Sequence, residues 1–180
     1  MEGTPVETLV FRARNKQFGI TISPSLLLEL LRHARTTPHL ETGGVLVGNY
    51  NEPLDHAALT EIVGPPPDSH AWRTGFIRGV RGLATRLRAL WDASSRSYYL
   101  GEWHFHPLGP ATASVDDKQQ MARIAADIRY NCPEPILIIL GGDPSGQWAI
   151  AAYVFTRSGG ELQMDQARSA GQYQEHTSHG

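Results

Sequence analysis

Residues 98–117, YYLGEWHFHPLGPATASVDD, join a predicted strand directly to a predicted helix. The aromatic-rich run 98–106 follows a Ser/Arg turn and is typical of a strand. Two prolines and a glycine within 107–110 end that strand. Ser114 then stands where a helix cap belongs, and Asp116 and Asp117 fall in the first helical turn. The segment therefore predicts a strand end that faces a helix start.

Two histidines in this strand are candidate metal ligands. His104 and His106 are two residues apart, so both side chains leave the strand on one face, roughly 7 Å apart at the backbone. A surface histidine beside a hydrogen-bonded core histidine would produce the same pair. With Asp117 added, two imidazoles and one carboxylate leave a fourth tetrahedral zinc position open to water, which is the arrangement of catalytic sites.

Three further polar residues are candidates for the chemistry. Ser114-x-x-Asp117 also fits a simple helix cap with an acid three residues on. This capping role is compatible with a catalytic one, in which the Ser114 hydroxyl turns toward the substrate. Zinc hydrolysis needs a carboxylate that accepts a proton from water. Glu41 as this base is favoured only slightly over a helix-end carboxylate that faces water, because a charge beside the glycines of a buried strand is costly without a task or partner. Glu102 shares the histidine face, and we expect it to support the ligands or the structure.

Outward from this segment, the hydrophobic pattern predicts a single domain that mixes helices and strands. Helices are expected over 23–35, with a Ser cap and Pro at its first position, over 83–91, lying on a sheet, and over 114–130. Strands are expected over 41–50, 59–63, 98–106, 136–140 and 147–156, the last two forming a hairpin through the turn 141–146.

The remaining segments are predicted to be irregular. Gly64 and three prolines break the chain before a loop that holds His70, Trp72 and Phe76. From Arg157 onward the sequence is polar and contains too few apolar residues for a core. We therefore expect a folded domain over residues 1–156 and a disordered tail over residues 157–180.

Composition excludes several classes of function. The 180 residues carry 16 Lys+Arg against 18 Asp+Glu, a net charge of −2 that provides no basic field for nucleic acid. Cys132 is the single cysteine, which excludes disulfide scaffolds and cysteine-type zinc sites. No window approaches the roughly 18 apolar residues of a membrane span, and the first twenty residues lack a signal pattern. A cytoplasmic protein without nucleic-acid or membrane partners is expected.

The motif resembles that of the JAMM (MPN-plus, JAB-domain) zinc metallo-isopeptidases. Their pattern is an upstream Glu followed by His-x-His-x(7)-Ser-x(2)-Asp. It occurs here as Glu41 in HLETGGVLVG and as His104, His106, Ser114 and Asp117 in GEWHFHPLGPATASVDD. The resemblance extends over residues 18–156 and implies an α/β (α+β) fold with a mixed, curved sheet flanked by helices, the JAB/MPN-like or cytidine-deaminase-like architecture. Residues 111–113 depart from the Pro-Ser or Pro-Thr that members often have before the serine.

By this resemblance, Zn²⁺ is bound by His104, His106 and Asp117, Glu41 is the general base, and Ser114 helps to hold the developing oxyanion. The implied reaction is hydrolysis of the bond after the C-terminal tail of a ubiquitin-like protein, in deconjugation or precursor processing. The motif is most similar to that of small bacterial members, some of which act beside ubiquitin-activating-like and conjugating-like enzymes in anti-phage systems. A non-catalytic MPN-type binding or assembly module is the alternative, disfavoured because all five motif positions are present.

Overall fold

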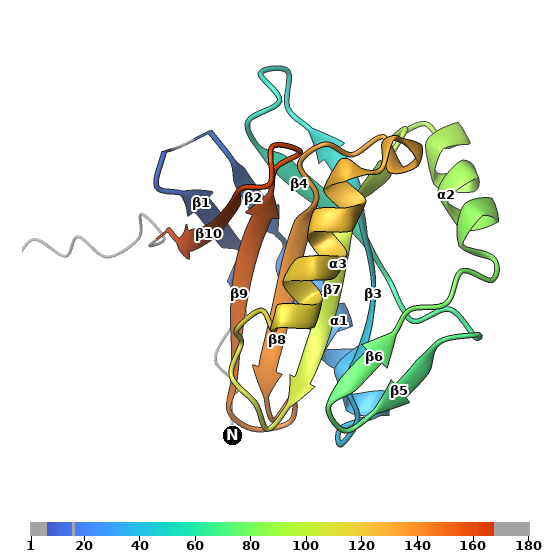
Figure 1. Ribbon diagram of the computed structural model, residues 1–180, viewed down its shortest axis with the longest axis vertical. Helices are drawn as coiled ribbons and strands as arrows, with labels where there is room; N and C mark the ends of the chain where they lie inside the picture. Colours follow the sequence, from blue (N-terminus) through green and yellow to red (C-terminus); the bar gives the residue numbers. More distant parts are fainter. Residues whose placement is uncertain (1–6, 16, 168–180) are drawn as a thin grey trace, which may run out of the picture.

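The computed structural model describes residues 7–15 and 17–167, which form one mixed β-structure with flanking helices (Figure 1). The elements are, in chain order, β1 (Leu9–Ala13), β2 (Gly19–Ile22), α1 (Pro24–Thr36), β3 (Thr42–Tyr50), β4 (Ala57–Val63), β5 (His70–Trp72), β6 (Gly75–Ile77), α2 (Leu83–Asp92), β7 (Tyr98–Pro107), α3 (Val115–Ala126), η1 (Ile128–Tyr130), β8 (Ile136–Gly142), β9 (Trp148–Phe155) and β10 (Glu161–Gln166).

Eight strands close into a barrel in the order β1-β10-β9-β8-β7-β3-β4-β2. The pairs β7/β8 and β2/β4 are parallel and the other pairs are antiparallel, so the sheet is mixed. Helix α3 runs along the face formed by β7, β8 and β9, while α1 lies behind the sheet (Figure 1). The predicted α+β class is confirmed, and closure of the sheet into a barrel is an added finding.

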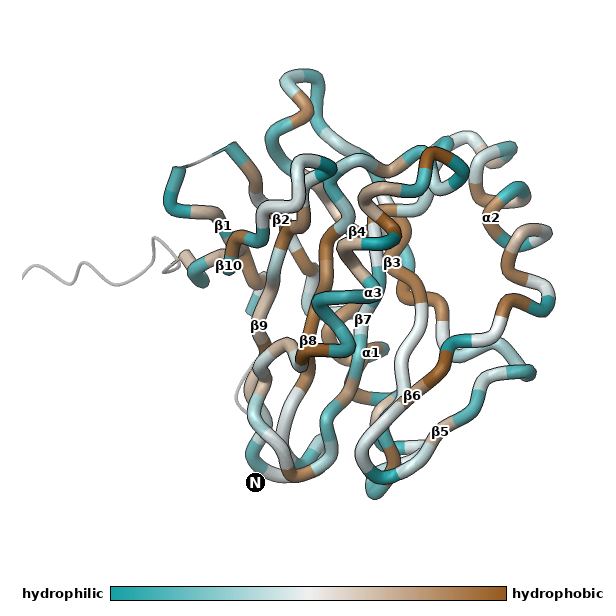
Figure 2. Tube along the Cα trace, viewed as in Figure 1, coloured by the Kyte–Doolittle hydropathy of each residue, from teal (hydrophilic) through white to brown (hydrophobic). Residues whose placement is uncertain are grey.

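The two faces of the sheet carry separate cores, because side chains alternate along each strand. On β8, Ile136 and Ile138 join the core shared with α1, whereas Leu137 and Ile139 join the core beneath α3. The hydropathy colouring shows β8 as brown along much of its length, as expected for a strand buried on both faces (Figure 2). On β7 the same alternation turns Trp103 and Phe105 toward α1 and leaves the other face free for polar side chains.

Several predicted elements are confirmed. Helix α1 begins at Pro24, and the side chain of Ser23 accepts the backbone N–H of Leu26. Strands β8 and β9 form the expected antiparallel hairpin. Gly44 of β3 lies where an added Cβ would stand 2.0 Å from the backbone oxygen of Val63, so this glycine is required for β3 to approach β4.

Helix α2 forms as predicted, whereas α3 is shorter than predicted. Helix α2 contacts the sheet at β7, where Trp91 meets Tyr98, but its leucines are only partly buried. It is also held by the two hydrogen bonds from Arg86 to Glu61. Helix α3 ends at Ala126 instead of residue 130. The extended backbone of Asp127, whose side chain accepts the N–H of Arg129, starts the short 3-10 turn η1.

Two segments that were predicted to be irregular form paired strands. The loop with His70, Trp72 and Phe76 forms a two-stranded hairpin, β5–β6. The prediction of disorder after Arg157 is wrong for β10, which pairs with both β9 and β1. Its sequence is polar because Met164 is its one buried residue. Residues 168–180 of the predicted tail lie outside the described residues. Strands β1 and β2 were not predicted at all.

No helix in the described ranges 7–15 and 17–167 has the length and apolar character needed to cross a membrane.

Candidate metal centre

Strand β7 and helix α3 together place three possible metal ligands in one cluster. His104 and His106 leave β7 on the face that α3 covers, and Asp117 lies in the first turn of α3. One ligand atom from each residue can be chosen so that all three atoms lie within 4.8 Å of one another. The structure thus brings together three of the residues that the motif singled out.

The donor set fits a divalent ion. His104 Nδ1 lies 2.5 Å from Asp117 Oδ1, and His106 Nε2 lies 3.3 Å from Asp117 Oδ2. His104 and Asp117 are buried, and His106 is partly buried. Two imidazoles and one carboxylate in a sheltered position match the ligand chemistry of zinc in catalytic sites, where a fourth position stays open.

His104 and Asp117 each shift the pKa of the other toward its charged form. Burial alone lowers the pKa of His104, but its contacts with Asp117 and Glu102 raise the pKa to about 9. Burial likewise raises the pKa of Asp117, but the two histidines bring it far below its usual range. The carboxylate is therefore ionised at any physiological pH and available to a cation.

The position of Asp117 is fixed by the start of α3. The hydroxyl of Ser114 accepts the N–H of Asp117 at 3.1 Å, and the N–H of Ser114 donates to Asp117 Oδ2 at 2.7 Å. This reciprocal capping box holds the carboxylate beside the histidines. The structure therefore shows the capping role of Ser114. Because its hydroxyl acts as an acceptor in the cap, its own O–H remains able to donate.

Glu41 lies immediately before β3, the strand that pairs with β7, and it is close enough to the cluster for the charges of His106 and Asp117 to act on it. The strands pair so that Gly43 is opposite His104, and an added Cβ on Gly43 would stand 2.7 Å from that ring. The backbone N–H of Glu41 donates to the Trp72 carbonyl at 2.9 Å. Partial burial raises the pKa of the Glu41 carboxyl, with opposing influence from His106. A raised pKa brings a carboxylate closer to the value that suits a general base.

The β5–β6 hairpin lies against the metal centre. The ring of Phe76 meets the ring of His104 edge to face, with centroids 6.0 Å apart. Trp72, by contrast, is 44% exposed. Of Trp72 and Phe76, Phe76 is the residue whose ring meets a predicted ligand.

A buried polar network behind His104 was only partly foreseen. Glu102 was expected to support the ligands, and it does lie beside His104. Its partners Arg78 and Gln120 were not predicted. Gln120 was accessible to sequence reasoning, because it follows Asp117 by one helical turn. Arg78 was not, because only the fold brings it to β7.

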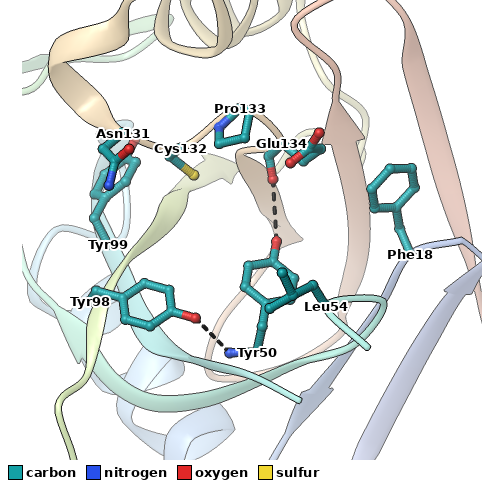
Figure 3. A pocket seen from close by; sticks show the side chains of 9 residues that line it. All are labelled: Phe18, Tyr50, Leu54, Tyr98, Tyr99, Asn131, Cys132, Pro133 and Glu134. Carbon is teal, nitrogen blue, oxygen red and sulfur yellow. Dashed lines mark hydrogen bonds between the residues drawn. The ribbon is translucent and has the colours of Figure 1, made fainter. Parts of the chain in front are cut away.

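A separate hollow of about 200 Å³ lies away from these residues (Figure 3). The Tyr98 hydroxyl accepts the backbone N–H of Tyr50, and the Tyr50 side chain points toward Glu134, whose backbone carbonyl accepts its O–H. Its lining includes none of the five motif residues. It is therefore not part of the candidate metal centre.

The two proposed roles of Ser114 predict different effects of substitution. Ser114→Ala should lower the free energy of unfolding by about 1 kcal/mol through loss of the cap, and Ser114→Gly by only a few tenths of that. If the hydroxyl also stabilises an oxyanion, both variants should lose about 10²–10³ in kcat, whereas Ser114→Thr should retain activity. Urea unfolding and kcat measured on all three variants check this. Equal activity in Ser114→Gly and the wild type would limit Ser114 to capping.

Comparisons with known proteins agree with this geometry. The family described as Prok-JAB, prokaryotic homologs of the JAB domain, matches residues 23–154. A protein of Enterobacter hormaechei subsp. hoffmannii (strain UCI 50) named CD-NTase/cGAS isopeptidase is 40% identical over 159 residues, covering 88% of this chain and 87% of the relative. The probable metalloprotease y4qB of Sinorhizobium fredii (strain NBRC 101917 / NGR234) is 25% identical over 137 residues, covering 75% and 82%.

A solved structure shares the fold. The solution structure of protein DSY2949 from Desulfitobacterium hafniense superimposes with a TM-score of 0.55 at 21% identity, covering 80% of this chain and 86% of that protein.

Proposed function

This chain belongs to the family of prokaryotic homologues of the JAB domain, and from that premise we propose that it is a zinc-dependent isopeptidase. It is a JAB-type peptidase, with relatives named as an isopeptidase and a metalloprotease. The proposal that its activity is that of a zinc-dependent isopeptidase depends on one observation, the cluster of His104, His106 and Asp117 with Glu41 beside it. The same cluster argues against a non-catalytic binding module, which has no need of a complete donor set.

Each motif residue has a defined task in this proposal. His104, His106 and Asp117 would hold the ion, which when bound supplies a water that ionises near pH 7 and a Lewis acid for a carbonyl oxygen. Glu41 accepts a proton from the attacking water as the new C–O bond forms. Glu41 then delivers that proton to the lysine amine as the C–N bond breaks. Ser114 donates its O–H to the carbonyl oxygen while negative charge develops there.

A groove beside the metal centre is suited to a narrow substrate tail. It has a volume of about 440 Å³ and lies between the segment around β6 and helix α3. Its walls include Phe76, which contacts His104, and Gln120, one turn after Asp117. Within the part of the chain that the structure describes, β5 and β6 pair as strands only with each other, and the outer edge of β6 has no strand partner. An extended tail can add to such an edge as a strand and be directed toward the ion.

The name of one relative supports the proposed substrate class. An isopeptidase of CD-NTase/cGAS acts on a protein conjugate, and the shared sequence supports the same kind of substrate here. We propose that the cleaved bond follows the C-terminal tail of a ubiquitin-like protein or of a CD-NTase used in the same way, in an anti-phage pathway. Ubiquitin-activating-like and conjugating-like enzymes would form that conjugate.

Cleavage of defined conjugates tests this proposal. The purified chain, loaded with zinc, is incubated with a CD-NTase and with a ubiquitin-like protein, each joined through its C-terminus to a lysine side chain. We expect release of one of these proteins, loss of cleavage with a chelator, and recovery on adding zinc. A linear fusion through the same tail separates deconjugation from precursor processing. Binding without cleavage of either conjugate would favour the binding module instead.

A further inference from the structure

Glu102 is a buried carboxylate that the proposed reaction does not use. Its residue exposure is 0%, and it lies on β7 two residues before His104, on the same face. Its two oxygens have separate partners. Oε1 accepts from Arg78 Nε at 2.9 Å and from the Tyr99 hydroxyl at 3.4 Å, and Oε2 accepts from Gln120 Nε2 at 2.6 Å. The carboxylate is therefore held from two sides.

The partners of Glu102 come from different parts of the fold. Arg78 directly follows β6, and Gln120 lies on α3, one turn after Asp117. The Arg78 side chain is only 7% exposed, so the ion pair is withdrawn from water. A buried ion pair is often no more stabilising than a well-packed apolar pair, and such pairs are best attested where they fix an arrangement. Glu102 also has a neighbour on β7, and this neighbour is the group that the ion pair can hold in place.

That neighbour is the ring of His104. Nδ1 of the ring faces Asp117, and Nε2 faces Glu102 Oε2 at 3.6 Å. Among the described residues, Nε2 is buried and has no hydrogen-bond partner. A neutral imidazole carries its proton on one nitrogen and a lone pair on the other. The nitrogen that binds an ion must be the one without the proton, so the other nitrogen requires an acceptor.

We propose that Glu102 is a positioning residue for the metal ligand His104. Its carboxylate accepts the Nε2–H of the ring after a small movement, and so leaves the lone pair of Nδ1 directed at the ion. Arg78 and Gln120 hold the carboxylate in place, so that the hairpin β5–β6 and helix α3 both contribute to the order of the ligand. The inference rests on the proposed function, because it concerns the same metal centre.

Zinc affinity, measured by competition with a chelating dye, tests this role without relying on activity. Glu102→Gln removes the charge but leaves Arg78 unpaired in the interior, so this variant can lose stability for that reason alone. The double variant Glu102→Met/Arg78→Met removes both charges, and replacing a buried ion pair by apolar residues of similar volume is often neutral for stability. We expect both variants, where folded, to bind zinc about 10–100-fold more weakly than the wild type. Glu61→Gln, which removes the charge of Glu61 from its pair with Arg86 far from the metal centre, is the matched control and should leave zinc affinity unchanged.

The imidazole signals in an NMR spectrum give a second measurement. In the zinc-loaded wild type, His104 should show a protonated Nε2 whose hydrogen is shifted downfield by its acceptor, and this signal should be lost or moved in the double variant. A folded double variant that binds zinc within twofold of the wild type would overturn the inference and leave the proposed function intact. A wild type that binds no zinc would overturn the proposed function itself.

Discussion

Replacing Glu41 with glutamine is expected to slow hydrolysis of the conjugate by between about a hundredfold and ten-thousandfold while zinc stays bound. The substitution keeps the size of the side chain but removes its ability to accept a proton, which is the part of catalysis that a general base contributes. Zinc binding should persist, because the proposed ligands are His104, His106 and Asp117. The measurements are kcat on a defined conjugate and the zinc content of the same preparation.

The position of Glu41 makes this substitution conservative for folding. Its side chain is only partly buried, and its backbone N–H, not its carboxylate, makes the hydrogen bond to Trp72. The free energy of unfolding should therefore change little. Glu29→Gln on α1, whose exposed carboxylate pairs with Arg32, serves as a control that should keep full activity. A Glu41→Gln variant that cleaves at the wild-type rate would remove Glu41 from the proton transfer.

Replacing Asp117 with asparagine is expected to abolish the stabilisation that zinc gives to the fold. A ligand at 100 times its Kd raises the free energy of unfolding by about 2.7 kcal/mol. For a chain of this size that corresponds to a rise in Tm of roughly 5–10 °C. Asp117→Asn should show almost none of this rise, because a neutral amide is a poor ligand beside two imidazoles. Thermal unfolding with and without added zinc measures the effect.

The neighbouring acid provides the control for Asp117. Asp116 is exposed on the same first turn of α3 and is not in the cluster, so Asp116→Asn should keep the full response to zinc. Asparagine at position 117 keeps an oxygen for the N–H of Ser114, so the capping box does not need to fail with the metal site. An equal rise in Tm for Asp117→Asn and the wild type would exclude Asp117 as a ligand.

The predictable parts of the fold are those with strong local signals. Helix α1 has a cap, a proline and leucines at helical spacing, and β8 is a continuous apolar run. Strands β1, β2 and β10 have no such signal, because they are short and their stability comes from pairing with distant segments. Helix α2 shows the opposite case. Its apolar spacing predicted the helix correctly, but its leucines are only partly buried and none of its residues belongs to the core.

The candidate site also has a part that the local sequence predicts and a part that depends on the tertiary fold. The order and spacing of His104, His106 and Asp117 predict their convergence, because a strand and the helix that follows it place them locally. The contact between Arg78 and Glu102 depends on how the β5–β6 hairpin lies on β7, which no local pattern specifies. Sequence therefore reached the proposed ligands and general base, and structure was needed for the groups that hold them.

Elemental analysis of the purified wild-type protein determines whether this fold holds the proposed catalytic metal ion. The protein is loaded with zinc, passed through a desalting column and measured together with its concentration. We predict about one zinc per chain, as three protein ligands with one open position imply. A folded, zinc-treated protein that retains no metal would exclude a metal-dependent isopeptidase.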